Sequence, residues 1–429
     1  MNGKENAKSK RLKAAAIILG IAAVIASFFT GFLLRGAIVG KDAAALSEIA
    51  AYLKKYGVFD STTAELREFS AEDAARLVID NLPDEYATYY SAKEYDALTK
   101  RRNGKYEGVG IAVYAGTLDI AQVIINSPAF RAGFKAGDVL VSGRLADGRE
   151  FTFTDDLSVG EFLAAAGENA FEITVSRKGE TLTFGLRSEK YKSAYLLYKD
   201  KDGAFAYLGD YDEKLILTNA GDGIYDLPED VAYIRFDSFE GGAAQELKGM
   251  IDFMAERGKT KLILDMRGNG GGQMEVLSDF AGGVIKGANK MVLAYSKDNK
   301  GNFTEYNASR NYYNDCIEKI AVIADEFSAS ATECLIGAMI HYGGAFSENA
   351  LIIENESLTD GKARTYGKGI MQTTFTLSNG GAIKLTTAVV YRPDKTTCIH
   401  GKGITVSGDN AVVKSENKAI DRAVAVISG

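Results

Sequence analysis

The sequence predicts an α/β protein that carries a small inserted β-rich domain, a helical N-terminal region and one N-terminal transmembrane helix. Three observations predict this. Strand and helix patterns alternate after about residue 188, short β patterns fill residues 105–187, and an uncharged apolar run follows a basic amino terminus. The 429 residues suffice for two or three folded units, and 46% apolar residues exclude a disordered chain.

Composition excludes several classes of function. Formal charge is 50 − 57 = −7, so no basic excess predicts a nucleic-acid partner. Three cysteines are too few for a disulfide framework, although Cys316 and Cys398 remain free to pair, and Cys334 fits a helix core. With two histidines we expect no metal, and no segment predicts an organic cofactor.

The amino terminus predicts a membrane anchor. Residues 1–13 form a basic tail, and residues 14–34 carry no charge. At about 1.5 Å per residue this run spans roughly 32 Å, close to the hydrocarbon thickness of a bilayer. Because basic flanks stay cytoplasmic, we expect a single-pass cell-membrane protein with everything after Arg35 outside the cytoplasm. A cleaved signal peptide stays open as the alternative, since Ala44-Ala45 resembles a cleavage region.

Two segments follow the anchor. Residues 42–104 repeat apolar side chains at intervals of three and four, which predicts helices. Residues 105–187 contain short β patterns, and residues 171–186 alternate as a hairpin that turns at Lys178-Gly179. We therefore expect a helical region and then a β-rich domain of about 85 residues.

Residues 188–429 form the predicted α/β domain. Its expected strands are 231–236, 261–265, 291–295, 319–325 and 382–391, and its expected helices are 243–257 and 331–341. Such alternation predicts buried strands covered by helices. The polar residues 298–315 are interpreted as an exposed insertion.

A glycine loop, Gly268 to Gly272, follows the strand at 261–265 and precedes a helix. Its backbone N–H groups could bind an anion or an oxyanion, but a mere tight turn fits equally well. A nucleotide-binding enzyme is a weaker alternative, since the loop lacks GxxxxGK[ST] and the chain lacks an acidic metal cluster. Asp265 and Arg267 are interpreted as a structural ion pair beside this loop.

Ser330 directly precedes the expected helix at 331–341. At that position the positive end of the helix dipole would stabilise negative charge that develops when a serine nucleophile attacks. The competing interpretation is a helix cap, since Ser330-x-x-Glu333 is a capping box. His341 lies about 16 Å further along the same helix and cannot be the base, whereas His400 is not excluded. Lys368, between two glycines, could be a base if it is neutral, or only an exposed turn residue.

Several segments, in this order, resemble the carboxy-terminal processing peptidases, also called tail-specific proteases. They are NLPDEYATYYSAKEYDAL (81–98), GVGIAV (108–113), SPAFRAGFKAGDVL (127–140), LILDMRGNGGG (262–272), SASATE (328–333), TYGKGIMQ (365–372) and GKGITV (401–406). The resemblance covers most of the chain after residue 42. It implies a crotonase/ClpP-like peptidase core at 188–429 and a PDZ domain at 105–187.

The resemblance also implies the site residues. Ser330 would be the nucleophile, Lys368 the general base and Gln372 the residue that orients the lysine. Backbone N–H groups of Ala331 and Gly271 would bind the oxyanion. The PDZ loop Gly108, Val109, Gly110 and Ile111 would receive a substrate's C-terminal carboxylate and either deliver substrate or gate the site.

The implied function is a membrane-anchored serine endopeptidase that cleaves protein substrates near exposed C-termini, and assembly of several copies stays open. The alternative from another class is a catalytically silent PDZ scaffold that binds protein C-termini. One departure concerns spacing: the 38 residues from Ser330 to Lys368 exceed what the family suggests. We expect the extra residues to be a surface insertion around residues 348–362.

Overall fold

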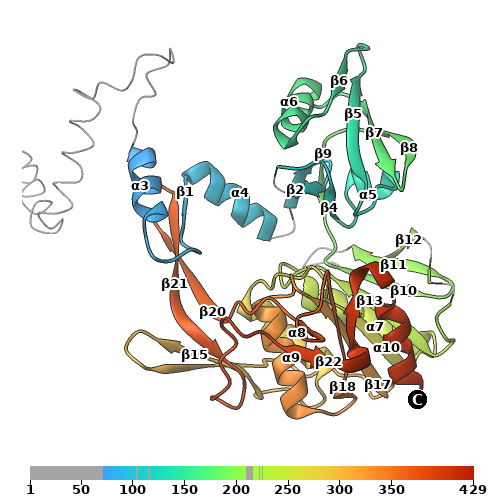
Figure 1. The fold of residues 1–429 in the computed structure, drawn as a ribbon, viewed down its shortest axis with the longest axis vertical. Helices are drawn as coiled ribbons and strands as arrows, with labels where there is room; N and C mark the ends of the chain where they lie inside the picture. The colour runs from blue at the N-terminus through green and yellow to red at the C-terminus, as the bar shows by residue number, and fades with distance from the viewer. Residues whose placement is uncertain (1–70, 103–104, 115, 209–215, 222, 225) are drawn as a thin grey trace, which may run out of the picture. The chain divides into compact units, whose positions relative to one another are not determined.

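The computed structural model describes residues 71–102, 105–114, 116–208, 216–221, 223–224 and 226–429 (Figure 1). The chain divides into two compact units, Met1–Ser91 and Ala92–Gly429. The predicted tail at 1–13 and transmembrane helix at 14–34 lie outside the described residues. Among the helices that are described, none is long and apolar enough to cross a membrane.

The predicted helical region 42–104 is divided between the two units. The described part of the first unit contains α3 (Ala71–Asp80) and β1 (Thr88–Tyr90). The second unit opens with α4 (Ala92–Arg102). The prediction of helices is therefore correct for α3 and α4, but a short strand separates them.

The β-rich domain has its own core. Its elements are β2 (Lys105–Gly108), β3 (Ile111–Val113), β4 (Ile120–Val123), α5 (Pro128–Ala132), β5 (Val139–Leu145), β6 (Glu150–Thr152), α6 (Asp156–Ala166), β7 (Phe171–Arg177), β8 (Glu180–Leu186) and β9 (Glu189–Lys192). Phe162 of α6 packs edge-on against Phe153 and Phe171 in this core. The predicted hairpin is β7–β8, and both turn residues, Lys178 and Gly179, have positive φ. Because β9 pairs with β2, the domain extends to Lys192.

An eight-stranded sheet forms the main domain. Its order is β12 (Ile216–Gly221), β11 (Gly203–Leu208), β10 (Leu196–Asp200), β13 (Val231–Phe236), β14 (Lys261–Asp265), β17 (Lys319–Asp325), β18 (Phe346–Asn355) and β23 (Ala411–Val413). In this order, β13, β14, β17, β18 and β23 run parallel to one another. The pairs β12–β11, β11–β10 and β10–β13 are antiparallel. The predicted strands 231–236, 261–265 and 319–325 are thus three neighbours of one parallel sheet.

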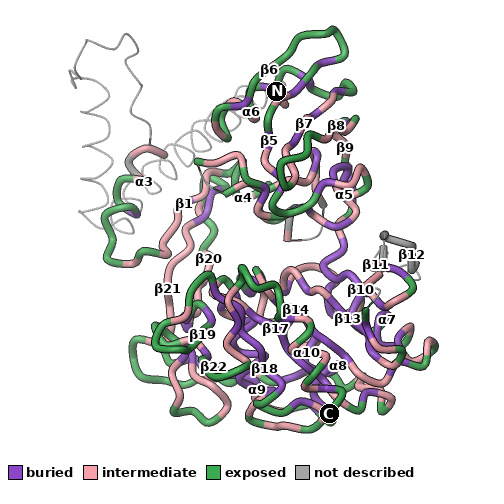
Figure 2. Tube along the Cα trace, turned by 45° about the vertical axis from the view of Figure 1, so that its right-hand side comes forward, coloured by how far each residue is buried: buried purple, intermediate pink, exposed green. Residues whose placement is uncertain are grey.

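Helices cover this sheet. The connections carry α7 (Ala243–Glu256), α8 (Met274–Val284) and α9 (Ala331–Tyr342), and α10 (Ala419–Ser428) packs on β14, β17 and β18. Strands β13, β14 and β17 are buried along nearly their whole length, as Figure 2 shows. Burial on both faces explains why these strands read as continuous apolar runs.

A second sheet and short elements complete the domain. The ribbon β20 (Ile370–Thr376) and β21 (Ala382–Tyr391) continues through β15 (Val292–Asp298) to β16 (Phe303–Asn307) (Figure 1). β19 (Lys362–Arg364) pairs with β22 (Thr405–Ser407), and 3-10 turns occupy Gly408–Asn410 and Lys414–Glu416.

Two expected insertions are wrong in part. Residues 298–315 are largely exposed, as expected, but they include β16, which pairs with β15 and so contributes a strand. Residues 348–362 are only partly a surface insertion, because β18 includes residues 348–355 and is buried from Ala350 to Asn355, whereas residues 356–362 are largely exposed. The long spacing between Ser330 and Lys368 therefore contains a strand of the main sheet, and apolar residues such as Leu351 and Ile352 fit that burial.

Glu246 of α7 is a buried carboxyl group in the main core. It accepts hydrogen bonds from Tyr195 N at 2.7 Å and Leu196 N at 3.0 Å. Burial raises the pKa of Glu246 to about 8, and the two N–H groups oppose that rise. The native state therefore keeps a proton at a pH where the unfolded chain, with a pKa near 4.3, has already lost it.

We predict that this carboxyl makes stability fall with rising pH. From about pH 5 to about pH 8, the free energy of unfolding should fall by up to about 1.4 kcal/mol per pH unit through this group alone. Glu246→Gln removes the titration and should flatten that part of the slope, measured by urea unfolding at a series of pH values. Glu256→Gln, an exposed glutamate of the same helix, is the control; an equal slope in wild type and Glu246→Gln would contradict the prediction.

Candidate active site at the ends of the parallel strands

Ser330 lies at the junction between β17 and α9. The loop 326–330 leaves the carboxyl end of β17, and Ser330 caps the first turn of α9. Its φ is 58°, a left-handed value that a non-glycine residue adopts only when its surroundings enforce it. Its backbone N–H donates to Glu333 Oε2 at 2.9 Å. The capping interpretation is therefore correct for the backbone N–H of Ser330. The backbone conformation also sets the direction in which the half-buried Ser330 side chain leaves the chain.

Asp325, at the end of β17, joins this loop to the glycine loop. Its Oδ1 accepts hydrogen bonds from Gly268 N at 3.0 Å and from Ser328 N at 2.9 Å. Ser328 Oγ in turn donates to Met266 O at 2.8 Å. Burial raises the pKa of Asp325, opposed by these hydrogen bonds. The two loops that follow neighbouring strands are thus held at one edge of the sheet.

Gly271 makes the closest approach between the two loops. A Cβ added there would lie 2.8 Å from Ser330 Cβ and 2.9 Å from Ala331 N, and φ is +99°. The structure therefore brings together the glycine and the serine that the sequence singled out. Ala331 N–H is the first N–H of α9, which has no partner within the helix. Gly271 N–H donates to Asn269 Oδ1 at 2.9 Å, so binding an oxyanion there requires this bond to be exchanged.

Glu333 joins the serine loop to the lysine loop. Its Oε2 accepts from Ser330 N and from Lys368 N, each at 2.9 Å. Its Oε1 accepts from Thr365 Oγ1 at 2.6 Å and from Gly367 N at 2.8 Å. Burial raises the pKa of this fully buried carboxyl, while the four donors hold it down. One carboxylate thus fixes the backbone at both Ser330 and Lys368.

Lys368 lies between two close backbone contacts. Gly367 O accepts from Gly401 N at 2.9 Å, and a side chain at Gly369 would collide with the backbone of His400. Burial lowers the pKa of the half-buried Lys368, and the positive charge of Lys384 lowers it further. Both effects favour the neutral form of the Lys368 side chain.

The other titratable candidates occupy different places. His400 shares the Lys368 region through its backbone, while its side chain is exposed. His341 lies in the last turn of α9, eleven residues from Ser330, and is also exposed. Gln372 lies on β20 opposite Thr386, beside an irregularity in the pairing at Met371.

All three cysteines are free thiols, so the structure contains no bond between Cys316 and Cys398. Cys334 is buried in α9, where burial raises the pKa of its thiol to about 12. Within the described parts of the chain, no three His, Cys, Asp or Glu side chains gather as a metal site.

A cluster of charged side chains, Asp265, Arg267 and Glu354, lies at the start of the glycine loop. Arg267 donates through Nη2 to Asp265 Oδ2 at 2.6 Å and through Nη1 to Glu354 Oε2 at 2.9 Å. Tyr233 Oη adds a third contact, to Asp265 at 2.7 Å. The predicted ion pair of Asp265 and Arg267 is therefore confirmed, and Glu354 of β18 is a partner that sequence reasoning missed.

The predicted peptide loop lies between β2 and β3. Val109 is buried, and Gly108 and Gly110 both have positive φ. Gly110 touches Ser127, since an added Cβ would collide with the Ser127 side chain, and Ile124 N donates to Gly110 O at 2.9 Å. Ile111 begins β3 and pairs with Val123. The four residues thus form a close turn at the start of a strand.

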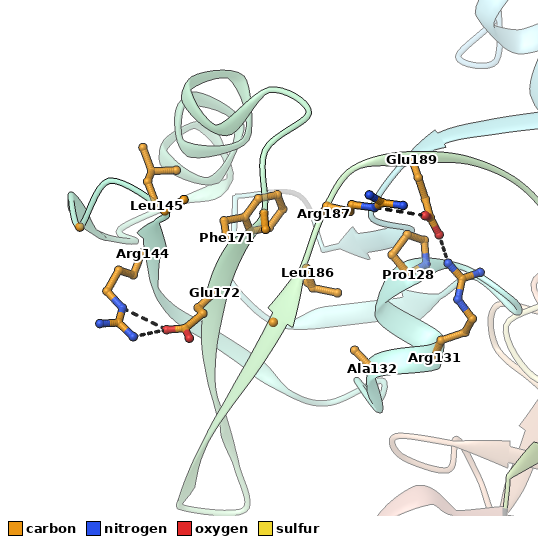
Figure 3. Close-up of a pocket in the computed structure, with 14 residues that line it drawn as sticks. Pro128, Arg131, Ala132, Arg144, Leu145, Phe171, Glu172, Leu186, Arg187 and Glu189 are labelled. Atoms are coloured by element: carbon orange, nitrogen blue, oxygen red, sulfur yellow. Dashed lines mark hydrogen bonds and ion pairs between the residues drawn. The ribbon is translucent and has the colours of Figure 1, made fainter.

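A separate pocket of about 800 Å³ lies elsewhere in the β-rich domain (Figure 3). Apolar residues that include Leu145, Phe171 and Leu186 line it, and three arginines surround them. Arg144 is paired with Glu172 at 2.5 Å, and Glu189 pairs with both Arg131 and Arg187. None of the four predicted peptide-loop residues lines this pocket.

We predict that Gly271, but not its neighbour Gly270, is intolerant of a side chain. Gly271→Ala should lower the free energy of unfolding by roughly 2–5 kcal/mol, because it combines an unfavourable φ with collision against backbone. Gly270→Ala meets nothing within 4 Å and should cost at most about 1 kcal/mol. Urea unfolding measures both, and equal stability of the two variants would show that the loops do not approach as described.

Comparison with known proteins identifies the main domain. Residues 230–407 match the model of peptidase family S41. A carboxyl-terminal-processing protease of Picosynechococcus sp. (strain PCC 7002) is 26% identical over 75% of this chain and 69% of its own length. Carboxyl-terminal-processing peptidase 3, chloroplastic, of Arabidopsis thaliana is 25% identical over 77% of this chain and 60% of its own length. The aligned region thus spans 69% and 60% of the lengths of these two relatives.

A solved structure gives the same fold. A candidate S41 protease from Bacteroides fragilis NCTC 9343 aligns with a TM-score of 0.51 at 12% identity, covering 89% of this chain and 96% of that chain. At this identity the likeness concerns the fold alone. Residues 230–407 thus form a domain that matches peptidase family S41, and the chain is similar over about three quarters of its length to carboxyl-terminal-processing proteases.

Proposed function

We propose that this chain is a membrane-anchored endopeptidase that cleaves protein substrates near their C-termini outside the cytoplasm. Ser330 is the nucleophile and Lys368 is the general base. The observation that carries the proposal is the Glu333 carboxylate, which accepts hydrogen bonds from the backbone N–H groups of both residues. A carboxylate that holds both loops supports a dyad formed by residues 38 positions apart.

The environment of Lys368 supports its role as a base. A lysine accepts a proton only in its neutral form, and burial together with Lys384 lowers the pKa of Lys368 toward that form. Neutral Lys368 takes the proton from Ser330 Oγ as the oxygen attacks the peptide carbonyl carbon. The amine leaving group takes that proton when the acyl-enzyme forms, and water then hydrolyses the ester with Lys368 again as base.

Two N–H groups serve the oxyanion in this scheme. Ala331 N–H lies at the start of α9, where the helix dipole favours negative charge. Gly271 N–H joins it after it releases Asn269 Oδ1. Gln372, on the strand that follows Lys368, orients the lysine side chain.

The β-rich domain recognises the substrate or gates the site. Positive φ at Gly108 and Gly110 turns the loop at the start of β3, which supports capture of a C-terminal carboxylate by N–H groups of Gly108, Val109, Gly110 and Ile111. A bound peptide would then add to β3 as a further strand.

The proposed anchor is the uncharged run at residues 14–34, with the basic tail on the cytoplasmic side. We predict that the full chain fractionates with membranes and that a chain starting at residue 42 does not. External proteinase should digest the peptidase domain of intact wall-stripped cells. Protection of that domain until the cells are lysed would contradict the proposed orientation.

We predict that Ser330→Ala and Lys368→Ala each abolish cleavage of an unfolded protein with an exposed apolar C-terminus, by at least about 10³-fold in kcat/KM. Cleavage is followed by mass spectrometry of the products. The wild-type rate should rise with pH as Lys368 loses its proton, below the pH at which an exposed lysine titrates.

Lys402→Ala is the control, since Lys402 is exposed in the neighbouring loop. All variants should unfold at similar urea concentrations. Undiminished cleavage by Lys368→Ala would refute the dyad. Binding of C-terminal peptides without any cleavage by wild type would favour a silent scaffold.

A further inference from the structure

Two exposed aromatic side chains flank the candidate dyad. Phe327 lies three residues before Ser330, and Tyr366 lies two residues before Lys368. Each side chain is 47% exposed, whereas the aromatic residues of the core, such as Phe236 and Phe280, are fully buried. Single exposed apolar residues are common, but two large ones on the loops that carry the candidate dyad form a surface that can bind an apolar group.

The backbone holds these two residues side by side. Tyr366 N donates to Ser328 O at 3.1 Å, which joins the segment containing Tyr366 to the residue that follows Phe327. Phe327 N donates to Asp325 Oδ1 at 3.0 Å. The rings thus start from neighbouring, well-bonded stretches of chain.

Both stretches belong to the framework that holds Ser330 and Lys368. Glu333 Oε1 accepts from Thr365 Oγ1 and Gly367 N, the residues on either side of Tyr366. Ser328, between Phe327 and Ser330, is fixed by Asp325 and Met266. Because the backbone of this framework is already fixed by hydrogen bonds, a ligand that binds the exposed apolar side chains pays little conformational entropy to order the loops.

We propose that Phe327 and Tyr366 form an apolar wall that binds a bulky apolar side chain of the substrate next to the scissile bond. This inference rests on the proposed function and assigns a specificity to the same site. The occupant is a substrate side chain because the wall lies on the two loops that carry the nucleophile and the base. Neither aromatic residue takes part in proton transfer.

The test compares cleavage sites of wild type and of the double variant Phe327→Ser/Tyr366→Ser in one unfolded protein substrate, identified by mass spectrometry. Wild type should favour bonds flanked by Leu, Phe or Tyr over bonds flanked by Ser or Thr by at least about tenfold in kcat/KM. The double variant should lose that preference. Cleavage at bonds flanked by Ser or Thr should change less than about threefold.

Matched variants separate this inference from general damage. Phe375→Ser changes a residue of similar exposure, 45%, which lies on β20 about 17 Å from Ile370 at roughly 3.3 Å per residue. It should keep the preference. Tyr366→Phe should also keep it, because the proposal uses the ring and not the hydroxyl. Urea unfolding should show that all variants fold.

The outcomes distinguish two failures. If wild type and Ser330→Ala cleave alike, the proposed function fails. If cleavage depends on Ser330 but the double variant keeps the apolar preference, the aromatic wall is refuted and the proposed function stands. A uniform loss of cleavage at all bonds would assign the rings to contact with another part of the protein, which also refutes the wall.

Discussion

The candidate site depends on one buried carboxylate. Glu333 accepts four hydrogen bonds, two at each oxygen, from donors on the serine loop and on the lysine loop. A carboxylate away from water is costly unless donors surround it, so the group is stable only when both loops are in place. The hydrogen bonds that stabilise the buried Glu333 carboxylate are therefore the same bonds that fix the positions of the serine loop and the lysine loop.

The parallel sheet provides the rest of the arrangement. Strands β13, β14 and β17 end at the same edge, so the loops that follow β14 and β17 meet there. Gly271 allows contact between their backbones, and Asp325 joins them by hydrogen bonds. The hydrogen bonds of Arg267 to Asp265 and Glu354 also connect the glycine loop to β18.

Sequence reasoning predicted the main-domain strands closely, because continuous apolar runs such as 261–265 and 319–325 are typical of buried parallel strands. It also singled out Gly271, Ser330 and Lys368, which the structure gathers in one region. It did not predict that Glu333 also binds the lysine loop. The spacing Ser-x-x-Glu predicts a local cap, whereas the bonds to Gly367 and Lys368 link residues more than thirty positions apart.

The interpretation of residues 348–362 failed in part for a related reason. A spacing that is long against a family pattern suggests an insertion, but β18 is a strand of the main sheet, paired between β17 and the edge strand β23. Asn269 and Asp325 were also missed, since a polar residue at a strand end gives no signal of its partners. Only the fold shows that Asn269 bonds to Phe236, Gly271 and Thr332.

The bond from Thr365 N to Ile404 O has a consequence for the way the enzyme becomes active during folding. The lysine segment is held by backbone bonds to Gly401 and Ile404, which lie more than thirty positions further along the chain. A folding intermediate that has formed α9 but not these contacts therefore carries Ser330 without an ordered lysine. Proteolytic competence arises only when this distant part of the chain closes onto the lysine segment.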